Sequence, residues 1–176
     1  LKNRITWELA YYNKRTNGVI LDLAVPRSLG FSSYYDNVGA VNNAGIEFSF
    51  SSTNIRTENF SWRTDFNVAR NWNEILDIGV YTQDAVSGGT NDTRVVVGSP
   101  IGTNYLVRFS HVEKETGRNV YLDKDGNETY EWSNNNRVAV GSVLPKAVGG
   151  LTNNFTYKNW NLSFLFVYKL GGNIYN

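Results

Sequence analysis

The sequence predicts an all-β fold of long antiparallel strands, and three observations favour a segment of a transmembrane β-barrel over a soluble β-sandwich. Large apolar and small polar residues alternate along several segments, as they do on β-strands with two different faces. The best segments run for about ten residues, which suits a tilted membrane crossing better than the ~5–6 residues of a globular strand. Short connections alternate with long ones, and aromatic residues cluster near the strand ends. A sandwich also alternates, so both folds stay open on these patterns.

The first 25 residues predict two strands. Residues 4–13 form the first, and its apolar face carries Ile5, Trp7, Leu9 and Tyr11. A polar turn is predicted at residues 13–18, which are rich in Asn, Lys, Arg, Thr and Gly. The second strand follows at residues 19–25 and ends at Pro26, because proline cannot donate a ladder hydrogen bond.

Two further strands are predicted before the middle of the chain. A long loop at residues 26–44 leads into alternation at residues 46–51, where Ile46, Phe48 and Phe50 share one face. A polar turn at residues 53–59 then precedes a strand at 60–69. Its apolar face carries Phe60, Trp62, Thr64, Phe66 and Val68.

A hairpin closes the pattern near the C-terminus. Residues 151–157 and 160–169 alternate, and Lys158-Asn159 makes the tight turn between them. Between the two strand groups, residues 72–146 predict short strands at 94–97, 105–109, 119–122 and 137–140, most of them in an elaborated extracellular loop. Whether residues 104–112 cross the membrane stays open. No helix is predicted.

Composition excludes several classes of function. A net charge of +1 provides no field for nucleic acid, and the absence of cysteine excludes disulfides and thiol catalysis. Aromatic residues make up 14% of the chain, with 16 Gly and 3 Pro, which is typical of β-structure. The sequence contains no run of about 18 apolar residues, so it predicts no transmembrane helix. Because the chain starts at Leu1 and has no leader segment, we expect an internal or processed fragment.

Motifs that could carry chemistry are weak. Residues 123–127 (DKDGN) resemble half of a calcium loop, but Asn134 stands where the twelfth-position acid would be, so an Asp-Gly turn is the favoured interpretation. His111, the only histidine, is expected to be structural or exposed. Glu113 and Glu115 show no sign of converging on a cleft. We therefore expect no catalytic residue, no metal site and no cofactor.

Three charged residues lie on the small polar face of strong strands: Glu47, Arg63 and Asp65. In a barrel this face lines the lumen, where the three could pair with each other, contact a plug or touch solute. In a sandwich the same face would be solvated. They are the candidate lumen-facing residues.

An ordered set of motifs resembles the SusC/RagA-type TonB-dependent transporters over nearly the whole chain. The set begins with residues 11–16 (YYNKRT), 37–39 (NVG), 43–47 (NAGIE), 60–62 (FSW), 66–67 (FN) and 73–75 (NEI). It continues with residues 100–102 (PIG), 115–117 (ETG), 123–127 (DKDGN), 137–138 (RV), 144–146 (LPK), 149–150 (GG) and 171–176 (GGNIYN). Residues 142–143 (SV) and 104–107 (NYLV) depart from the family pattern at junctions between loops and strands.

The resemblance implies an outer-membrane importer in a Gram-negative bacterium. Residues 1–176 would be a fragment of a barrel of about 22 strands, with a long extracellular loop region at about 72–146 and no plug domain in this chain. TonB would drive import through regions outside the chain, and a SusD-like lipoprotein would help to capture an oligosaccharide or oligopeptide substrate. The strands would contact outer-membrane lipid. The alternative is a soluble carbohydrate-binding β-sandwich with sugars stacked on exposed Trp and Tyr.

Overall fold

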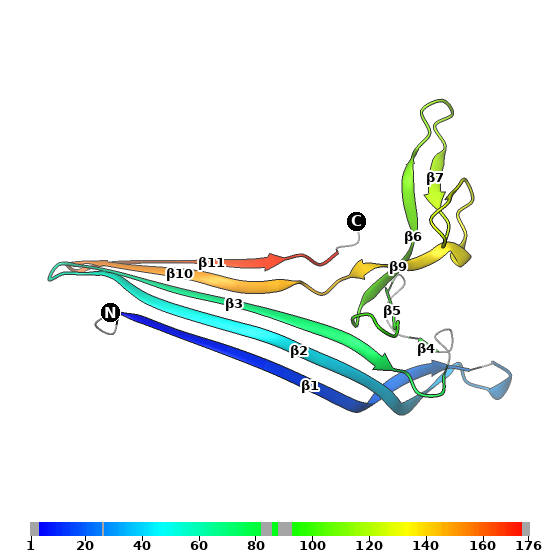
Figure 1. Ribbon diagram of the computed structural model, residues 1–176, viewed down its shortest axis with the longest axis horizontal. Coiled ribbons are helices and arrows are strands. Elements are labelled where there is room, and N and C mark those ends of the chain that lie inside the picture. The colour runs from blue at the N-terminus through cyan, green and yellow to red at the C-terminus, as the bar shows by residue number, and fades with distance from the viewer. Residues whose placement is uncertain (1–3, 26, 82–85, 88–92, 174–176) are drawn as a thin grey trace. The chain divides into compact units, whose positions relative to one another are not determined.

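A computed structural model describes residues 4–25, 27–81, 86–87 and 93–173 (Figure 1). The chain divides into two compact units, each described separately below. The long-strand unit comprises Leu1–Arg15, Asn42–Asn73 and Pro145–Gly171, and the short-strand unit comprises Thr16–Val41, Glu74–Leu144 and Gly172–Asn176. Pro26 and residues 174–176 of the last family motif lie outside the described residues.

Five long antiparallel strands build the sheet of the long-strand unit. The sheet order is β11-β10-β3-β2-β1, and Figure 1 shows the strands side by side. Their bounds are β1 (Ile5–Ala24), β2 (Ser33–Arg56), β3 (Phe60–Asp77), β10 (Ala147–Tyr157) and β11 (Trp160–Leu170). The C-terminal part of β1, the N-terminal part of β2 and the end of β3 belong to the short-strand unit. The predicted all-β, antiparallel fold is confirmed.

The register fixes which residues share a face. In β10, Leu151 lies opposite Phe66 of β3 and Phe166 of β11, and Phe155 lies opposite Trp62 and Leu162. The next residues along the strands fall on the other side, because side chains alternate along a strand. The apolar and polar sets predicted for residues 60–69, 151–157 and 160–169 are therefore correct.

The short turns lie at one end of the long strands. β2 and β3 are joined at residues 57–59, where the Thr57 amide donates to the Phe60 carbonyl at 2.7 Å. β10 and β11 are joined by Lys158 and Asn159, with Lys158 at a φ of 51°. The predicted two-residue hairpin is confirmed, and the turn predicted at 53–59 is shorter than expected.

Two sequence predictions are wrong because strands continue through turn-like sequence. The turn predicted at residues 13–18 does not form, since β1 runs unbroken from Ile5 to Ala24 over 20 residues. The loop predicted at residues 26–44 is largely strand, since β2 begins at Ser33 and runs for 24 residues. Pairing with neighbouring strands outweighs the turn preference of Asn, Lys and Gly in both places.

In the part of the chain that the structure describes, the short-strand unit contains six short strands. They are β4 (Val86–Ser87), β5 (Thr93–Arg94), β6 (Thr103–Val112), β7 (Asn119–Leu122), β8 (Glu128–Thr129) and β9 (Arg137–Ser142). β6 changes partner along its length, because Thr103–Val107 pairs with β9 and Arg108–Val112 pairs with β7. Three of the short strands predicted in this region, at 105–109, 119–122 and 137–140, appear as β6, β7 and β9. The strand predicted at 94–97 is wrong, because only Arg94 of that range lies in a strand, the two-residue β5.

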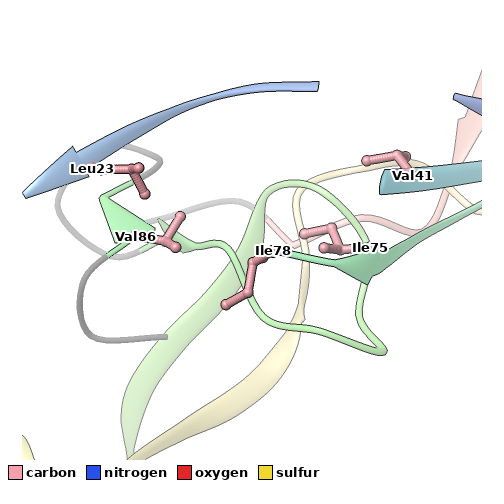
Figure 2. Close-up of a cluster of buried hydrophobic side chains, with 5 residues drawn as sticks. All are labelled: Leu23, Val41, Ile75, Ile78 and Val86. Carbon is pink, nitrogen blue, oxygen red and sulfur yellow. The ribbon is translucent and has the colours of Figure 1, made fainter. Parts of the chain in front are cut away.

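A small apolar core lies in the short-strand unit. Figure 2 shows its five buried members, which are Leu23, Val41, Ile75, Ile78 and Val86. Two short 3₁₀ turns, Arg27–Leu29 and Asn134–Asn136, complete the unit. Among the described residues, no helix is both long enough and apolar enough to span a membrane.

Candidate functional site: the two faces of the long-strand sheet

One face of the long-strand sheet carries two groups of aromatic rings in contact, and we call it the aromatic face. Trp62 stacks on Phe155 with ring centroids 5.5 Å apart, and Phe155 stacks on Phe164 at 5.8 Å. Phe66 lies 6.4 Å from both Phe48 and Tyr168. These contacts cross β2, β3, β10 and β11, so the rings hold neighbouring strands together by offset and tilted stacking.

No second protein layer of the described residues covers the aromatic face. Trp7, Leu9, Tyr11, Leu162 and Phe166 all keep at least 60% of their surface exposed. In a β-sandwich this face would interlock with an opposing sheet and be dry. Large apolar side chains in this number are rarely left exposed without a partner surface. The exposure contradicts the sandwich alternative and leaves a face that needs an apolar environment.

A polar relay interrupts the aromatic face. Asn153 is 9% exposed, and its Oδ1 accepts hydrogen bonds from the Trp62 indole at 2.9 Å and the Thr64 hydroxyl at 2.7 Å. Asn54 Nδ2 donates to Thr64 Oγ1 at 2.7 Å, so the relay crosses three strands. Alternation did not predict this relay. The sequence feature that could have indicated it is Asn153, a polar residue between Leu151 and Phe155 on the apolar face.

Tyrosines pack over glycines on both faces. On the aromatic face, Tyr168 of β11 lies over Gly149 of β10 and donates to the Asn67 carbonyl of β3 at 2.9 Å. On the other face, Tyr12 of β1 lies over Gly45 of β2 and donates to Asn71 of β3 at 2.9 Å. Each tyrosine spans an intervening strand, which is possible because glycine has no side chain.

The opposite face of the sheet, which we call the polar face, holds the three candidate residues. Asp65 forms a bidentate ion pair with Arg63, with Nη2 2.8 Å from Oδ1 and Nε 3.1 Å from Oδ2, and also accepts from Ser51 at 2.8 Å. Glu47 does not join this pair. It lines a shallow hollow with Glu8, Ser49 and Asn67.

An amide cluster lies on the same polar face, beyond Glu47 along the strands. Asn43 Oδ1 accepts from Asn71 Nδ2 at 3.1 Å and from Asn73 Nδ2 at 2.8 Å, and Asn71 accepts from Tyr12. These residues were not among the sequence predictions. Asn43 lies an even number of residues from Glu47, and Asn71 and Asn73 lie an even number from Asp65. Because side chains alternate along a strand, this spacing could have placed all three on the polar face.

The calcium-like motif is an Asx-stabilised turn in this structure. Asp123 Oδ1 accepts the backbone amides of Asp125 at 2.9 Å and Asn127 at 2.8 Å. Hydrogen bonds from Asn127 hold the pKa of Asp123 below its ordinary value, and the amide of Asp125 adds to this. In the described part of the chain, no cluster of three or more acidic, histidine or cysteine side chains could hold a metal.

His111 and the neighbouring acids form surface contacts. His111 Nδ1 lies 3.4 Å from Glu128 Oε1, and both side chains are more than half exposed. Glu113 accepts hydrogen bonds from Thr116 and from Tyr130, which keep the pKa of Glu113 below its ordinary value. These contacts tie turns of the short-strand unit together, as expected for structural or exposed residues.

Comparisons with known proteins give consistent relatives. No protein-family model matches the chain. The TonB-dependent receptor P26 of Formosa agariphila is 35% identical over 98% of this chain and 19% of its own length. The TonB-dependent receptor SusC of Bacteroides thetaiotaomicron is 29% identical over 99% of the chain and 18% of its length.

Solved structures agree with these relatives. The structure of the RagAB peptide transporter superposes with a TM-score of 0.84 and 25% identity, over 96% of this chain and 19% of that one. The RagAB peptide importer in the closed-closed state gives 0.84 and 26%, over 97% and 20%. The chain spans about a fifth of the length of its relatives. By sequence and by strand arrangement, these 176 residues belong to the SusC/RagA-type TonB-dependent receptors, as a segment of their antiparallel transmembrane β-barrel.

Proposed function

We propose that the protein containing this chain imports a nutrient, a glycan or a peptide, across the outer membrane of a Gram-negative bacterium. The import is driven by TonB, and a SusD-like surface lipoprotein assists in substrate capture. The exposed aromatic face carries the proposal, because a face of this kind is stable against hydrocarbon and not against water. The similarity to TonB-dependent receptors and to the RagAB peptide transporter supports it.

The proposed orientation assigns roles to both faces. The aromatic face contacts lipid, with Trp62, Tyr157 and Trp160 near the short turns at one membrane interface. The polar face lines the lumen, so Glu47, Arg63 and Asp65 are lumen-facing. The ion pair between Arg63 and Asp65 suits this placement, because charges inside a barrel are solvated or paired.

The proposal also concerns the extracellular loops, the plug domain and the segment that contacts TonB. Residues 72–146, with the short strands β6 to β9, form an extracellular loop region. The plug domain and the segment that contacts TonB belong to other parts of the protein. We assign transport and not catalysis. Glu47, Arg63 and Asp65 suit the lining of a barrel lumen, and Asp65 is paired with Arg63 instead of facing a second acid as general acid–base catalysis would need.

Uptake by whole cells tests the proposal. Cells that express the full-length receptor and its lipoprotein partner should accumulate a labelled oligosaccharide or oligopeptide. We expect accumulation to stop when TonB is deleted or a protonophore collapses the inner-membrane gradient, because the proposed import takes its energy from that gradient through TonB. Accumulation that continues unchanged without TonB would contradict the proposal.

A further inference from the structure

An arginine lies at one end of the aromatic face, on an inner strand of the sheet. Arg70 of β3 follows Trp62, Phe66 and Val68 at even positions, so it shares their face. β3 is paired on both sides, with β2 and with β10, so this position is not on an outer strand of the segment. The Arg70 guanidinium carbon lies 4.7 Å from the ring centroid of Trp72, and both residues are exposed.

A second pair of a cation and an aromatic ring marks the other end of the same face. Lys158 Nζ lies 5.6 Å from the ring centroid of Tyr157, at the turn between β10 and β11. Tyr157 lies opposite Phe60, the first residue of β3. Between the two pairs, β3 and β10 place only uncharged residues on this face, namely every second residue of 62–68 and of 149–155. The two cations therefore bound an uncharged span.

The length of this span matches the apolar band of a membrane barrel. Arg70 lies ten residues after Phe60 along β3. At ~3.3 Å per residue and a tilt of ~40°, such a stretch rises ~25 Å along the membrane normal, which is about the height of the band. Arg70 and Trp72 are therefore at the level of the lipid headgroups, where arginine and tryptophan side chains anchor barrels and helices alike.

The free donors of Arg70 select the chemistry of a ligand. No carboxylate of the described residues pairs with Arg70, so its N–H groups are available to an acceptor outside the sheet. A guanidinium can donate two parallel hydrogen bonds to a phosphate, and an aromatic ring against it restricts its orientation. The aliphatic stem of arginine can lie on apolar surface while the charged group reaches the headgroups. A phosphate at the membrane surface fits this arrangement.

We propose that Arg70 and Trp72 bind the phosphate headgroup of an outer-leaflet lipid, on the outside of the barrel. The inference rests on the proposed function for its orientation, because the short turns of bacterial barrels face the periplasm and Arg70 lies at the opposite end of β3. The acyl chains of the lipid then lie along the aromatic face, so the headgroup and the chains are held by one continuous surface.

Lipid retention by the full-length receptor tests the site. The receptor is purified with its lipoprotein partner in neutral detergent and mixed with monophosphoryl lipid A, and the bound lipid is counted by native mass spectrometry. We expect Arg70→Gln to lower the retained lipid about fivefold and Arg70→Lys to lower it less, since lysine keeps the charge but not the paired hydrogen bonds. Lys169→Gln is the matched control and should leave retention unchanged, because Lys169 lies opposite Val148 on the polar face, near the same end of the strands.

Two further probes separate the headgroup from the chains and from free phosphate. The first is lipid A from which the phosphate has been removed, and the second is inorganic phosphate. We expect the native receptor to retain about fivefold less of the phosphate-free lipid, with no further loss in Arg70→Gln. Inorganic phosphate at the concentration of the lipid should not displace it, because free phosphate has no acyl chains to contact the aromatic face.

Four results would overturn the inference. They are unchanged retention in Arg70→Gln, an equal loss in Lys169→Gln, equal retention of the phosphate-free lipid, and displacement of the lipid by inorganic phosphate. Uptake separates the two proposals. TonB-dependent import together with unchanged lipid retention in Arg70→Gln removes the lipid site alone, whereas import that does not need TonB, in a receptor whose retention depends on Arg70, removes the proposed function alone.

Discussion

At the scale of single residues, Gly149 shows how tightly the sheet is built. A Cβ atom there would overlap the Asn67 carbonyl oxygen and the Tyr168 hydroxyl, whereas at Gly150 the nearest atom is the flexible Leu165 Cδ1 at 3.3 Å. We expect Gly149→Ala to destabilise the receptor by about 2 kcal/mol and Gly150→Ala by much less, because only the first forces backbone movement. Unfolding of the full-length receptor in detergent measures both. Equal losses of stability for the two substitutions would contradict the claim that the close contacts with Asn67 and Tyr168 make Gly149 the more sensitive glycine.

The relay around Asn153 gives a second prediction at this scale. Asn153→Leu removes the acceptor of the Trp62 indole and the Thr64 hydroxyl, on a face that meets hydrocarbon in the proposed orientation. We expect a loss of about 1–3 kcal/mol for each donor left unsatisfied. Asn154→Leu, one residue away on the polar face, is the matched control and should cost under about 1 kcal/mol, because its partner Ser163 is exposed to solvent. A control that costs as much as Asn153→Leu would contradict the relay.

Sequence could predict the faces of these residues but not their contacts. Alternation assigned Phe66, Phe155 and Phe164 to one side, because the period of a strand is two. It did not predict the Asn153 relay on the aromatic face, or the aliphatic Leu165 and Val167 on the polar face. Such exceptions become meaningful only when the register shows which residue lies across each strand.

At the scale of elements, β1 and β2 show where local signals fail. Residues 13–18 have the composition of a turn, yet they lie inside β1, which runs from Ile5 to Ala24. Gly18 takes a φ of 68° within the strand, which accommodates a local irregularity without ending it. By contrast, the Lys158-Asn159 turn was predictable, because strong alternation on both sides left only these two residues between the strands.

The turn after β6 gives a prediction at the element scale. Hydrogen bonds from Thr116 and Tyr130 favour the Glu113 carboxylate, so its pKa lies below the ordinary value of 4.5. Stabilisation of the turn is therefore fully present above pH 4.5 and is lost as pH falls through the lowered pKa. The Gly117 amide, which donates to the Glu113 carbonyl at 2.9 Å, reports on the turn.

Hydrogen exchange measures this effect. After correction for intrinsic rates, the Gly117 amide should exchange faster near pH ~3 than near pH ~6 in the native receptor. In Glu113→Gln the corrected rate should no longer depend on pH, because the titrating group is gone. A corrected rate in the native receptor that is flat across this range would contradict the assignment.

At the scale of the whole molecule, the arrangement of faces is explained best by a barrel wall. Among the described residues, the sheet of the long-strand unit has one uncovered aromatic face and one polar face, and it lacks the second layer that a soluble domain needs. Within the long-strand unit, the outer strands β11 and β1 also need partners along their length, because open edges do not occur in lipid.

The family was predictable at this scale because its motifs occur in order along nearly the whole chain. The ordered blocks from residues 11–16 to 171–176 pointed to the same relatives that the comparisons found. The extended lengths of β1, β2 and β3 were not predictable, since polar residues near the ends of the long strands resemble loop sequence. The substrate does not follow from the motifs, because they describe the wall of the barrel.

The most direct test of the account is the solvent that each face of β2 and β11 meets. Single cysteines are placed in the full-length receptor in lipid and probed with a lipid-soluble and a water-soluble reagent. We predict that Ile46, Phe48, Phe50, Phe164 and Phe166 positions react from the lipid, while Glu47 and Ser163 positions react only from water. The reverse pattern, or aromatic positions shielded from both reagents in a dry protein interior, would contradict the barrel account.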